Sequence, residues 1–149
     1  MSEFRLIKQI LSLSQSKNWE IAKSEWLLKD VFFSEEHDTC LCGHYPIIEL
    51  CIIENKKNTK TATVGNCCVK KFIGLPSDSI FQAIKRIKKD KSKSLNSVAI
   101  EHAYTKKWIN QWEYDFYCDT LKKRKLTEKQ SAKRNQINEK VFKNFEVPL

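Results

Sequence analysis

The chain has 149 residues, of which 41% are apolar and 30% charged, with only three glycines and three prolines. This composition excludes collagen-like and low-complexity chains, and it argues against long flexible linkers and an all-β fold. The 27 basic and 18 acidic residues give a net charge of +9. No apolar run approaches the roughly 20 residues that cross a bilayer, and no signal peptide is predicted. We therefore expect a cytoplasmic protein, in a bacterial cytoplasm or inside a host cell, without a membrane partner.

The N-terminal part of the chain is predicted to be helical. Apolar residues recur at helical spacing over residues 3–14, which indicates a first helix. A second helix is predicted over residues 18–33, and it would turn Ala22 and Trp26 toward the core. Residues 1–37 are therefore expected to form a group of N-terminal helices.

The next segment, residues 38–76, carries a hairpin signal. Residues 47–54 read IIELCIIE, which is rich in β-branched side chains, and residues 60–64 are a plausible partner strand after a polar turn. A short helix is then predicted over residues 68–73, and Gly74 with the following proline should end it.

The rest of the chain, residues 77–149, is predicted to be a basic helical segment. Helices are expected over residues 79–90, from Asn96 or Ser97, over residues 109–121, and after Thr127. The last of these has a clear start signal, because Thr127 and Gln130 match a capping box. This segment holds 17 basic and 9 acidic residues, so it carries a net charge of +8 and almost all of the excess charge.

Two groups of basic residues stand out in this segment. The first basic cluster is Lys85, Arg86, Lys88 and Lys89, and the second basic cluster is Lys122, Lys123, Arg124 and Lys125. The second is followed by Lys129, Lys133 and Arg134. Such side chains contact phosphates and give affinity without sequence specificity. We expect a DNA or RNA backbone, or a nucleoprotein complex, as the partner; the alternative is a solvated helical surface.

The cysteines point to a metal site. Those that fall into one pattern are Cys40, Cys42, Cys67 and Cys68, whereas Cys51 and Cys118 lie outside it. Without a secretory signal a reducing compartment is expected, where disulfides are rare and cysteine clusters usually bind metal. Two of the three histidines, His37 and His44, flank the first cysteine pair.

The order of these residues is that of a treble-clef zinc finger. A tight turn at Gly43 presents two sulfurs, a hairpin returns the chain, and a helix N-terminus, which favours a thiolate, supplies further ligands. Tetrahedral Zn²⁺ takes four nitrogen or sulfur ligands. We expect these ligands to be Cys40, Cys42, Cys68 and His44, with Cys67 or His37 as alternatives for the fourth place. The competing interpretation is that the cysteines pack as small apolar side chains.

The same stretch resembles a known pattern. The strings CLCGHYPIIELCIIEN and VGNCCVKKF are similar to CxCG(H)…N…VGxxC(V/I)xxF, found in small treble-clef-like zinc-finger proteins of phages, mobile elements and large DNA viruses. The resemblance covers much of residues 20–140, and the finger motif is its most specific part. In that pattern the returning ligand matches Cys68, and Cys67 falls at a variable position. The resemblance implies zinc binding and nucleic-acid-related biology, without a catalytic activity.

Enzymatic motifs are not found. The chain has no dinucleotide fingerprint, P-loop, zinc-protease motif or nucleophile elbow. A His-Me nuclease would need a histidine at the hairpin and a partner on the helix, where this chain reads VKKFIG. Cys118 lies among aromatic residues and is expected to be part of the core. We predict that the protein is not an enzyme.

Aromatic residues lie between the basic clusters. Such rings can stack on the bases of single strands. The helical spacing of Ile109, Trp112 and Phe116 nevertheless favours packing in the core. If a ring is exposed, we expect Tyr114 or Tyr117, because each has a polar tip.

Together these patterns predict a mainly α fold with a small β-hairpin, in which a treble-clef-like zinc finger is embedded in a helical domain. The predicted function is a non-enzymatic, zinc-stabilised nucleic-acid or nucleoprotein-binding module of phage or mobile-element type. The alternative is a protein-binding inhibitor or adaptor that targets a host nucleic-acid-processing or defence complex, in the manner of an anti-CRISPR protein.

Overall fold

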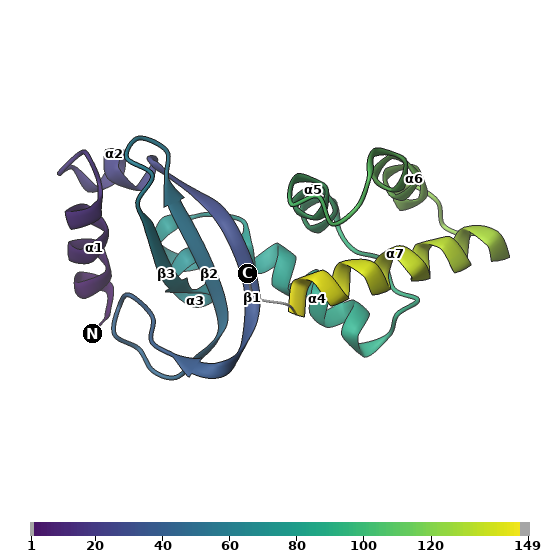
Figure 1. The fold of residues 1–149 in the computed structure, drawn as a ribbon, viewed down its shortest axis with the longest axis horizontal. Coiled ribbons are helices and arrows are strands. Elements are labelled where there is room, and N and C mark those ends of the chain that lie inside the picture. Colours follow the sequence, from purple (N-terminus) through teal and green to yellow (C-terminus); the bar gives the residue numbers. More distant parts are fainter. Residues whose placement is uncertain (1, 147–149) are drawn as a thin grey trace. The chain divides into compact units, whose positions relative to one another are not determined.

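The computed structural model describes residues 2–146, apart from the side chains of residues 2, 35, 37 and 146. The described chain forms two compact units, which we call unit 1 (residues 2–78) and unit 2 (residues 79–146). It is mainly helical, as the sequence patterns predict, and its small antiparallel sheet has three strands, one more than the predicted hairpin (Figure 1). None of the described helices has the length and apolar character needed to cross a membrane.

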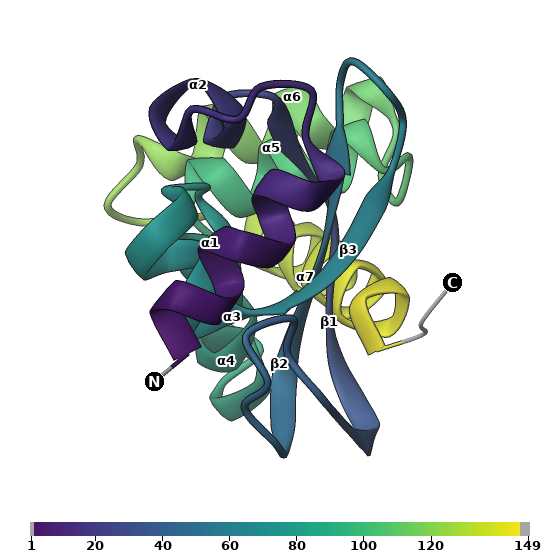
Figure 2. The ribbon, with the colours of Figure 1, turned by 90° about the vertical axis from the view of Figure 1, so that its left-hand side faces the viewer.

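Unit 1 is built around a three-stranded sheet. Its elements are α1 (Ser2–Leu13), α2 (Trp19–Lys23), β1 (Trp26–Asp38), β2 (Ile47–Asn55), β3 (Thr61–Gly65), α3 (Asn66–Cys68) and the π-helix η1 (Val69–Ile73). The strands lie in the order β1-β2-β3, and both pairs are antiparallel. Helices α1 and α3 lie alongside this sheet (Figures 1 and 2). Leu6 and Ile10 of α1 are completely buried, so this helix contributes its apolar side to the core of unit 1.

The predicted hairpin is confirmed. Strands β2 and β3 pair in a register that sets Cys51 opposite Val64, and both residues are completely buried. The short helix after the hairpin also ends where expected. Gly74 takes a left-handed conformation with φ of 82°, and its N–H bonds to the Val69 carbonyl oxygen, which is the usual role of glycine after a helix.

The helix predicted over residues 18–33 is wrong beyond its first turns. Helix α2 ends at Lys23, and the chain then forms the long strand β1, which pairs with β2. A bulge between Leu28 and Asp30 interrupts the register of this pair. The bulge disturbs the alternation that marks a strand, so that Asp30 and Val31, although adjacent, are both buried. The buried residues of this stretch are therefore spaced much like those on one face of a helix.

Unit 2 is a group of helices. Its elements are α4 (Ser77–Lys89), whose first two residues belong to unit 1, α5 (Ser97–Thr105), α6 (Gln111–Leu121) and α7 (Glu128–Glu146). The predicted start signals are confirmed. Asn96 caps α5 by accepting a hydrogen bond from the Ala99 N–H at 2.9 Å. Thr127 and Gln130 exchange both bonds of the capping box, at 3.0 and 3.1 Å.

The core of unit 2 joins α4, α6 and α7. The rings of Phe81 and Phe145 meet edge to face with centroids 5.6 Å apart. Tyr117 of α6 is completely buried, and its hydroxyl donates to Asn138 Oδ1 of α7 at 2.5 Å. The same hydroxyl accepts a hydrogen bond from the Leu95 N–H at 2.8 Å. This polar contact fixes the connection between α4 and α5 inside the core.

Candidate metal centre and basic surface

Three cysteine thiols converge in unit 1. Cys40 and Cys42 lie in the turn between β1 and β2, and Cys68 ends α3. The hairpin brings the chain back to this turn, where the Leu41 N–H donates to the Thr63 carbonyl oxygen at 3.1 Å. The three sulfur atoms all lie within 4.8 Å of one another, and the residues are only 3%, 4% and 9% exposed. This group could hold a metal ion.

The turn that carries the first two cysteines is tight. The Gly43 N–H donates to the Cys40 carbonyl oxygen at 2.7 Å, and the Cys40 N–H donates to the His44 carbonyl oxygen at 2.9 Å. Gly43 has the predicted positive φ, 94°. A Cβ atom at this position would lie 2.6 Å from Nη1 of Arg5, a residue of α1. The backbone conformation therefore favours glycine here, whereas the flexible end of the Arg5 side chain could move aside for a Cβ atom.

Backbone N–H groups point at the sulfur atoms. The Gly65 N–H donates to Cys40 Sγ at 3.2 Å, and the His44 N–H donates to Cys42 Sγ at 3.4 Å. These donors favour negative charge on sulfur, whereas burial raises the pKa of the Cys40 and Cys68 thiols. A divalent cation reverses this effect of burial, because a thiol that coordinates a metal loses its proton. The arrangement could therefore hold a metal ion through these three sulfurs.

The fourth ligand position is less closely defined. The group of three contains neither His44 nor Cys67, and both of these residues are exposed. Both nevertheless line a cavity of about 200 Å³ next to the three buried thiols, together with Lys71 and Phe72. The side chain of His37, the other alternative, lies outside the described residues. The fold thus brings together the three cysteines that the sequence predicts as ligands. Two of the candidates for the fourth position, His44 and Cys67, line the adjoining cavity.

The remaining two cysteines lie apart from this group. Cys51 is completely buried in β2, and burial raises its pKa to about 12, so it stays a neutral thiol in the core. Cys118 is half-buried in α6. Neither residue belongs to the group of three sulfurs.

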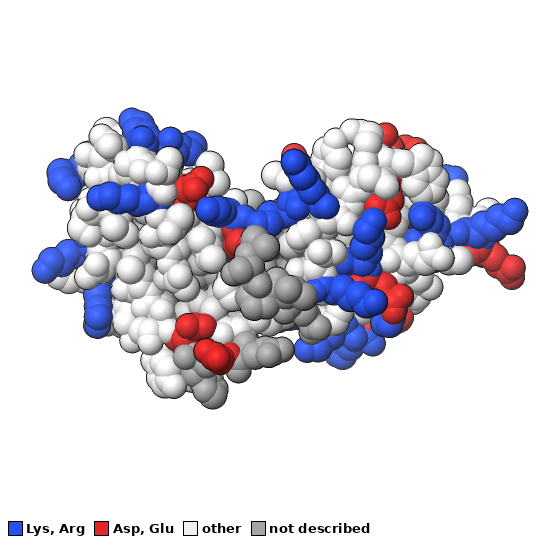
Figure 3. All heavy atoms as spheres, viewed as in Figure 1, with Lys and Arg blue, Asp and Glu red and all other residues white. Residues whose placement is uncertain are grey.

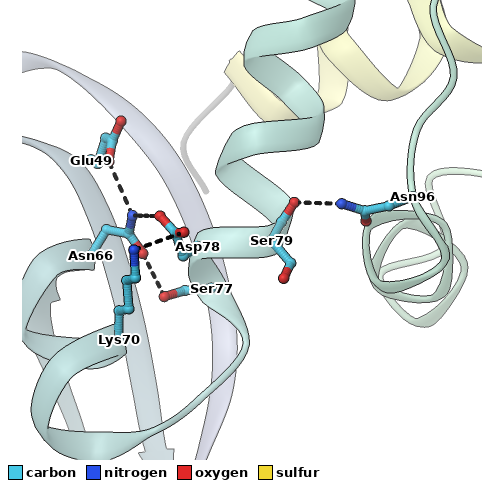
Figure 4. Close-up of polar contacts among 7 residues, drawn as sticks. All are labelled: Glu49, Asn66, Lys70, Ser77, Asp78, Ser79 and Asn96. Carbon is cyan, nitrogen blue, oxygen red and sulfur yellow. Dashed lines mark hydrogen bonds and ion pairs between the residues drawn. The ribbon is translucent and has the colours of Figure 1, made fainter.

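Asn66 connects the segment that carries Cys67 and Cys68 to its surroundings (Figure 4). Its Nδ2 atom donates to Glu49 Oε1 and to Asp78 Oδ1, each at 3.1 Å, and its Oδ1 accepts a hydrogen bond from Ser77 Oγ at 2.6 Å. Lys70 of η1 adds an ion pair with Asp78 at 3.2 Å. The residue that precedes the Cys67-Cys68 pair therefore holds the start of α4. Sequence reasoning missed this role, although an asparagine at a helix start is a visible signal.

The basic residues predicted to meet a polyanion all lie on the surface of unit 2. Every side chain of the first basic cluster, on α4, and of the second basic cluster, between α6 and α7, is exposed. Figure 3 shows Lys and Arg side chains over α4 and where α6 connects to α7. Among the described residues, the second basic cluster makes no ion pair with a carboxylate. Its four charges are therefore available to an external partner.

Arg134 differs from the lysines that precede it in sequence. It is only 8% exposed, and its Nη2 atom donates to the Thr120 carbonyl oxygen at 2.9 Å. Its guanidinium lies 5.2 Å from the centre of the Tyr117 ring. Arg134 is thus a structural residue, and its assignment to the extended second basic cluster is wrong.

The aromatic residues of α6 lie in the opposite environments from those predicted. Trp112, expected in the core, is 58% exposed, and its ring stacks on that of Phe116 with centroids 5.3 Å apart and planes 12° apart. Tyr117, expected as a possible exposed ring, is completely buried. The hydroxyl that favoured exposure instead finds two hydrogen-bond partners in the interior.

Comparison with protein-family models, with curated proteins and with solved structures finds no match to this chain. What the site does is therefore inferred from its own residues. These offer three buried thiols that can share one ion, and a separate set of exposed basic side chains on helical elements.

Proposed function

We propose that this protein is a non-enzymatic, zinc-stabilised module that binds the phosphate backbone of nucleic acid. The observation that carries the proposal is the exposure of all eight side chains of the two basic clusters on unit 2. Residues 77–149 also carry a net charge of +8. Phosphate contacts from such side chains supply most of the affinity in non-specific nucleic-acid binding.

The metal has a structural role in this proposal. Three cysteine sulfurs with a histidine or a fourth cysteine form a donor set that suits Zn²⁺, and four protein ligands close the site to substrate. The order of turn, hairpin and helix is that of a treble-clef finger, in which Cys40 and Cys42 come from the turn and Cys68 from the helix. His44 is our choice for the fourth ligand, with Cys67 as the alternative. Bound zinc would then fix the three parts of unit 1 that carry its ligands.

A second candidate function is a protein-binding inhibitor or adaptor that targets a nucleic-acid-processing complex. Large apolar side chains of unit 1 favour it, because Phe4, Tyr45 and Ile48 are 77%, 60% and 55% exposed. Aromatic residues are enriched in the buried cores of protein interfaces. In that case the lysines of unit 2 would occupy a surface that normally meets nucleic acid on the partner.

Binding of labelled generic DNA and RNA over a series of salt concentrations tests the proposal. Each phosphate contact contributes a log–log slope of about 0.9 for duplex DNA and about 0.7 for a single strand. Replacement of Lys122, Lys123, Arg124 and Lys125 by alanine should therefore flatten the slope by roughly two to three units. A chain that binds neither nucleic acid at low salt would overturn the proposal and leave the inhibitor or adaptor function as the better one.

The control variant removes the same charge from the other unit. Four exposed lysines of unit 1 serve this purpose: Lys17, Lys56, Lys57 and Lys60. If the slope depends only on the net charge of the chain, the two quadruple variants will behave alike. If the second basic cluster contacts phosphates, only its own replacement will flatten the slope. Metal content should stay unchanged in both variants, because none of these lysines belongs to the group of three thiols.

A further inference from the structure

Core packing does not explain the exposure of Trp112 on α6. Trp112 and Phe116 lie four residues apart and therefore on one face of the helix. Their rings are nearly parallel, and more than half of the Trp112 surface reaches solvent. A large exposed indole that is already oriented by a stacked neighbour is a flat, apolar surface that a further ring can cover.

Basic side chains lie near this surface. Lys133 of α7 places its ammonium group 5.2 Å from the centre of the Trp112 ring. Lys129 lies one helical turn before Lys133 and is exposed, and the second basic cluster occupies the connection between α6 and α7. Asp115 and Asp119 also lie near this face by their helical spacing from Trp112, but the lysines and the arginine outnumber them. A partner of this surface is expected to be both aromatic and anionic.

Nucleotides combine these two properties. A base can cover an indole, while its phosphate meets an ammonium group on a flexible lysine stem. In a duplex the bases are already stacked on each other and cannot reach a side chain on a helix surface, whereas a single strand presents their faces. The arrangement of aromatic and basic side chains therefore favours single strands over duplexes. The charge of unit 2 alone does not distinguish these two forms of nucleic acid.

We infer that Trp112 and Phe116 form a stacking platform for a base of single-stranded nucleic acid, with Lys133 and Lys129 holding the neighbouring phosphates. This inference rests on the proposed function and narrows it from nucleic acid in general to single strands. On arrival of the base, the Lys133 ammonium moves from the indole to the phosphate of the same nucleotide. Trp112 is the residue that the base contacts, and Phe116 positions its ring.

The test compares Trp112→Leu with Trp112→Phe in the full-length protein. The probes are thymidine and uridine oligonucleotides of about 12 nucleotides, within the usual site sizes of single-strand binders, together with a duplex and an abasic strand of the same length. Leucine keeps the apolar character but removes the aromatic face, so single-strand affinity should fall about tenfold or more, as expected for the loss of one stacked base. Phenylalanine should retain most of the affinity. Duplex and abasic-strand binding should change little in either variant.

Phe4→Leu provides the matched control, because Phe4 is the most exposed aromatic side chain of unit 1, at 77%. Its affinity for the single strand should equal that of the wild type. The thermal unfolding of all three variants should also match the wild type, since both aromatic side chains lie mostly in solvent.

Several outcomes overturn the inference. If Trp112→Leu keeps the single-strand affinity while replacement of the second basic cluster abolishes binding, the platform is wrong and the proposed function stands. If Trp112→Leu and Trp112→Phe lose affinity equally, the indole acts by packing rather than by stacking. If Trp112→Leu instead abolishes self-association without affecting nucleic acid, the surface is a contact between two copies of the chain. If the wild-type protein binds none of the probes, the proposed function and the platform fall together.

Discussion

Asn55, at the end of β2, donates a hydrogen bond from Nδ2 to the buried carboxylate of Glu25, with 2.9 Å between the nitrogen and Oε1. The same carboxylate accepts hydrogen bonds from the Gln15 and Ser16 N–H groups at 2.8 and 2.9 Å. Glu25 is only 1% exposed. The ionised side chain of Glu25 thus joins the segment after α1 to the end of β2, where the hairpin turns. The bond from Asn55, with the two backbone bonds, lowers the pKa of Glu25 below its ordinary value of 4.5.

Glu25→Gln should lower the melting temperature of unit 1 at neutral pH, because an amide cannot accept these three bonds as a carboxylate does. The depressed pKa fixes the sign of the pH dependence. The contribution of Glu25 is complete above the unfolded-state pKa, near 4.5, and is lost as the pH falls from there through the folded-state pKa. Thermal melts at pH 7 and below pH 4 should therefore show a difference between variant and wild type that shrinks on acidification. Glu20→Gln, at an exposed carboxylate paired with Lys23, should melt like the wild type.

Tyr117→Phe should destabilise unit 2. The substitution leaves the Leu95 N–H and Asn138 Oδ1 without the hydroxyl that satisfies them, and an unsatisfied buried polar group costs about 1–3 kcal/mol. Urea unfolding measures this loss. Tyr104→Phe is the matched control, because the hydroxyl of Tyr104 bonds to Gln111 at an exposed position, where a change of less than about 0.5 kcal/mol is expected. Equal stability of both variants would show that the buried hydroxyl contributes nothing.

Removal of the metal should unfold the turn and α3. We expect about one zinc ion per chain, and structural zinc contributes on the order of 10 kcal/mol of folding free energy in small fingers. Cys42→Ala should lose the metal, whereas Cys51→Ala should keep it, since Cys51 is a buried thiol outside the group of three. Elemental analysis and circular dichroism with and without a chelator check both. Metal retained by Cys42→Ala, or absent from freshly purified wild type, contradicts the assignment.

Two further variants test which residue is the fourth ligand. His44→Ala should release zinc to a chelator faster than Cys67→Ala, although both residues line the cavity beside the thiols. The opposite order of release would assign the place to Cys67. Equal release by both variants would mean that neither side chain completes the site.

Structural features that depend only on residues close together in the chain could be predicted from the sequence. The capping box of Thr127 and Gln130 and the positive φ of Gly43 are both of this kind, and both are confirmed. The gathering of Cys40, Cys42 and Cys68 follows from the same logic, because a hairpin necessarily returns the chain to the turn that precedes it.

Features that depend on distant partners could not be predicted in this way. The pairing of β1 with β2 joins residues far apart in the chain, whereas the spacing of Ala22 and Trp26 along the chain indicated a helix that continued to residue 33. The environments of Trp112 and Tyr117 depend on where α7 lies against α6. Spacing along α6 indicates only that rings share a face, whereas Asn138 and Arg134 of α7 determine that Tyr117 is the ring enclosed.

The Asn66 contacts imply that proteolysis can report whether the metal is bound. Asn66 holds Ser77 and Asp78, and it directly precedes the Cys67-Cys68 pair. If the proposed ion is removed, α3 should unfold and release this clamp, so residues 69–78 should become a loose segment, the kind that proteases cut first. Trypsin would then cleave after Lys70 or Lys71 in the stripped chain and spare the loaded one. Under the proposed zinc binding, the lifetime of this protein inside a cell would accordingly follow the supply of zinc.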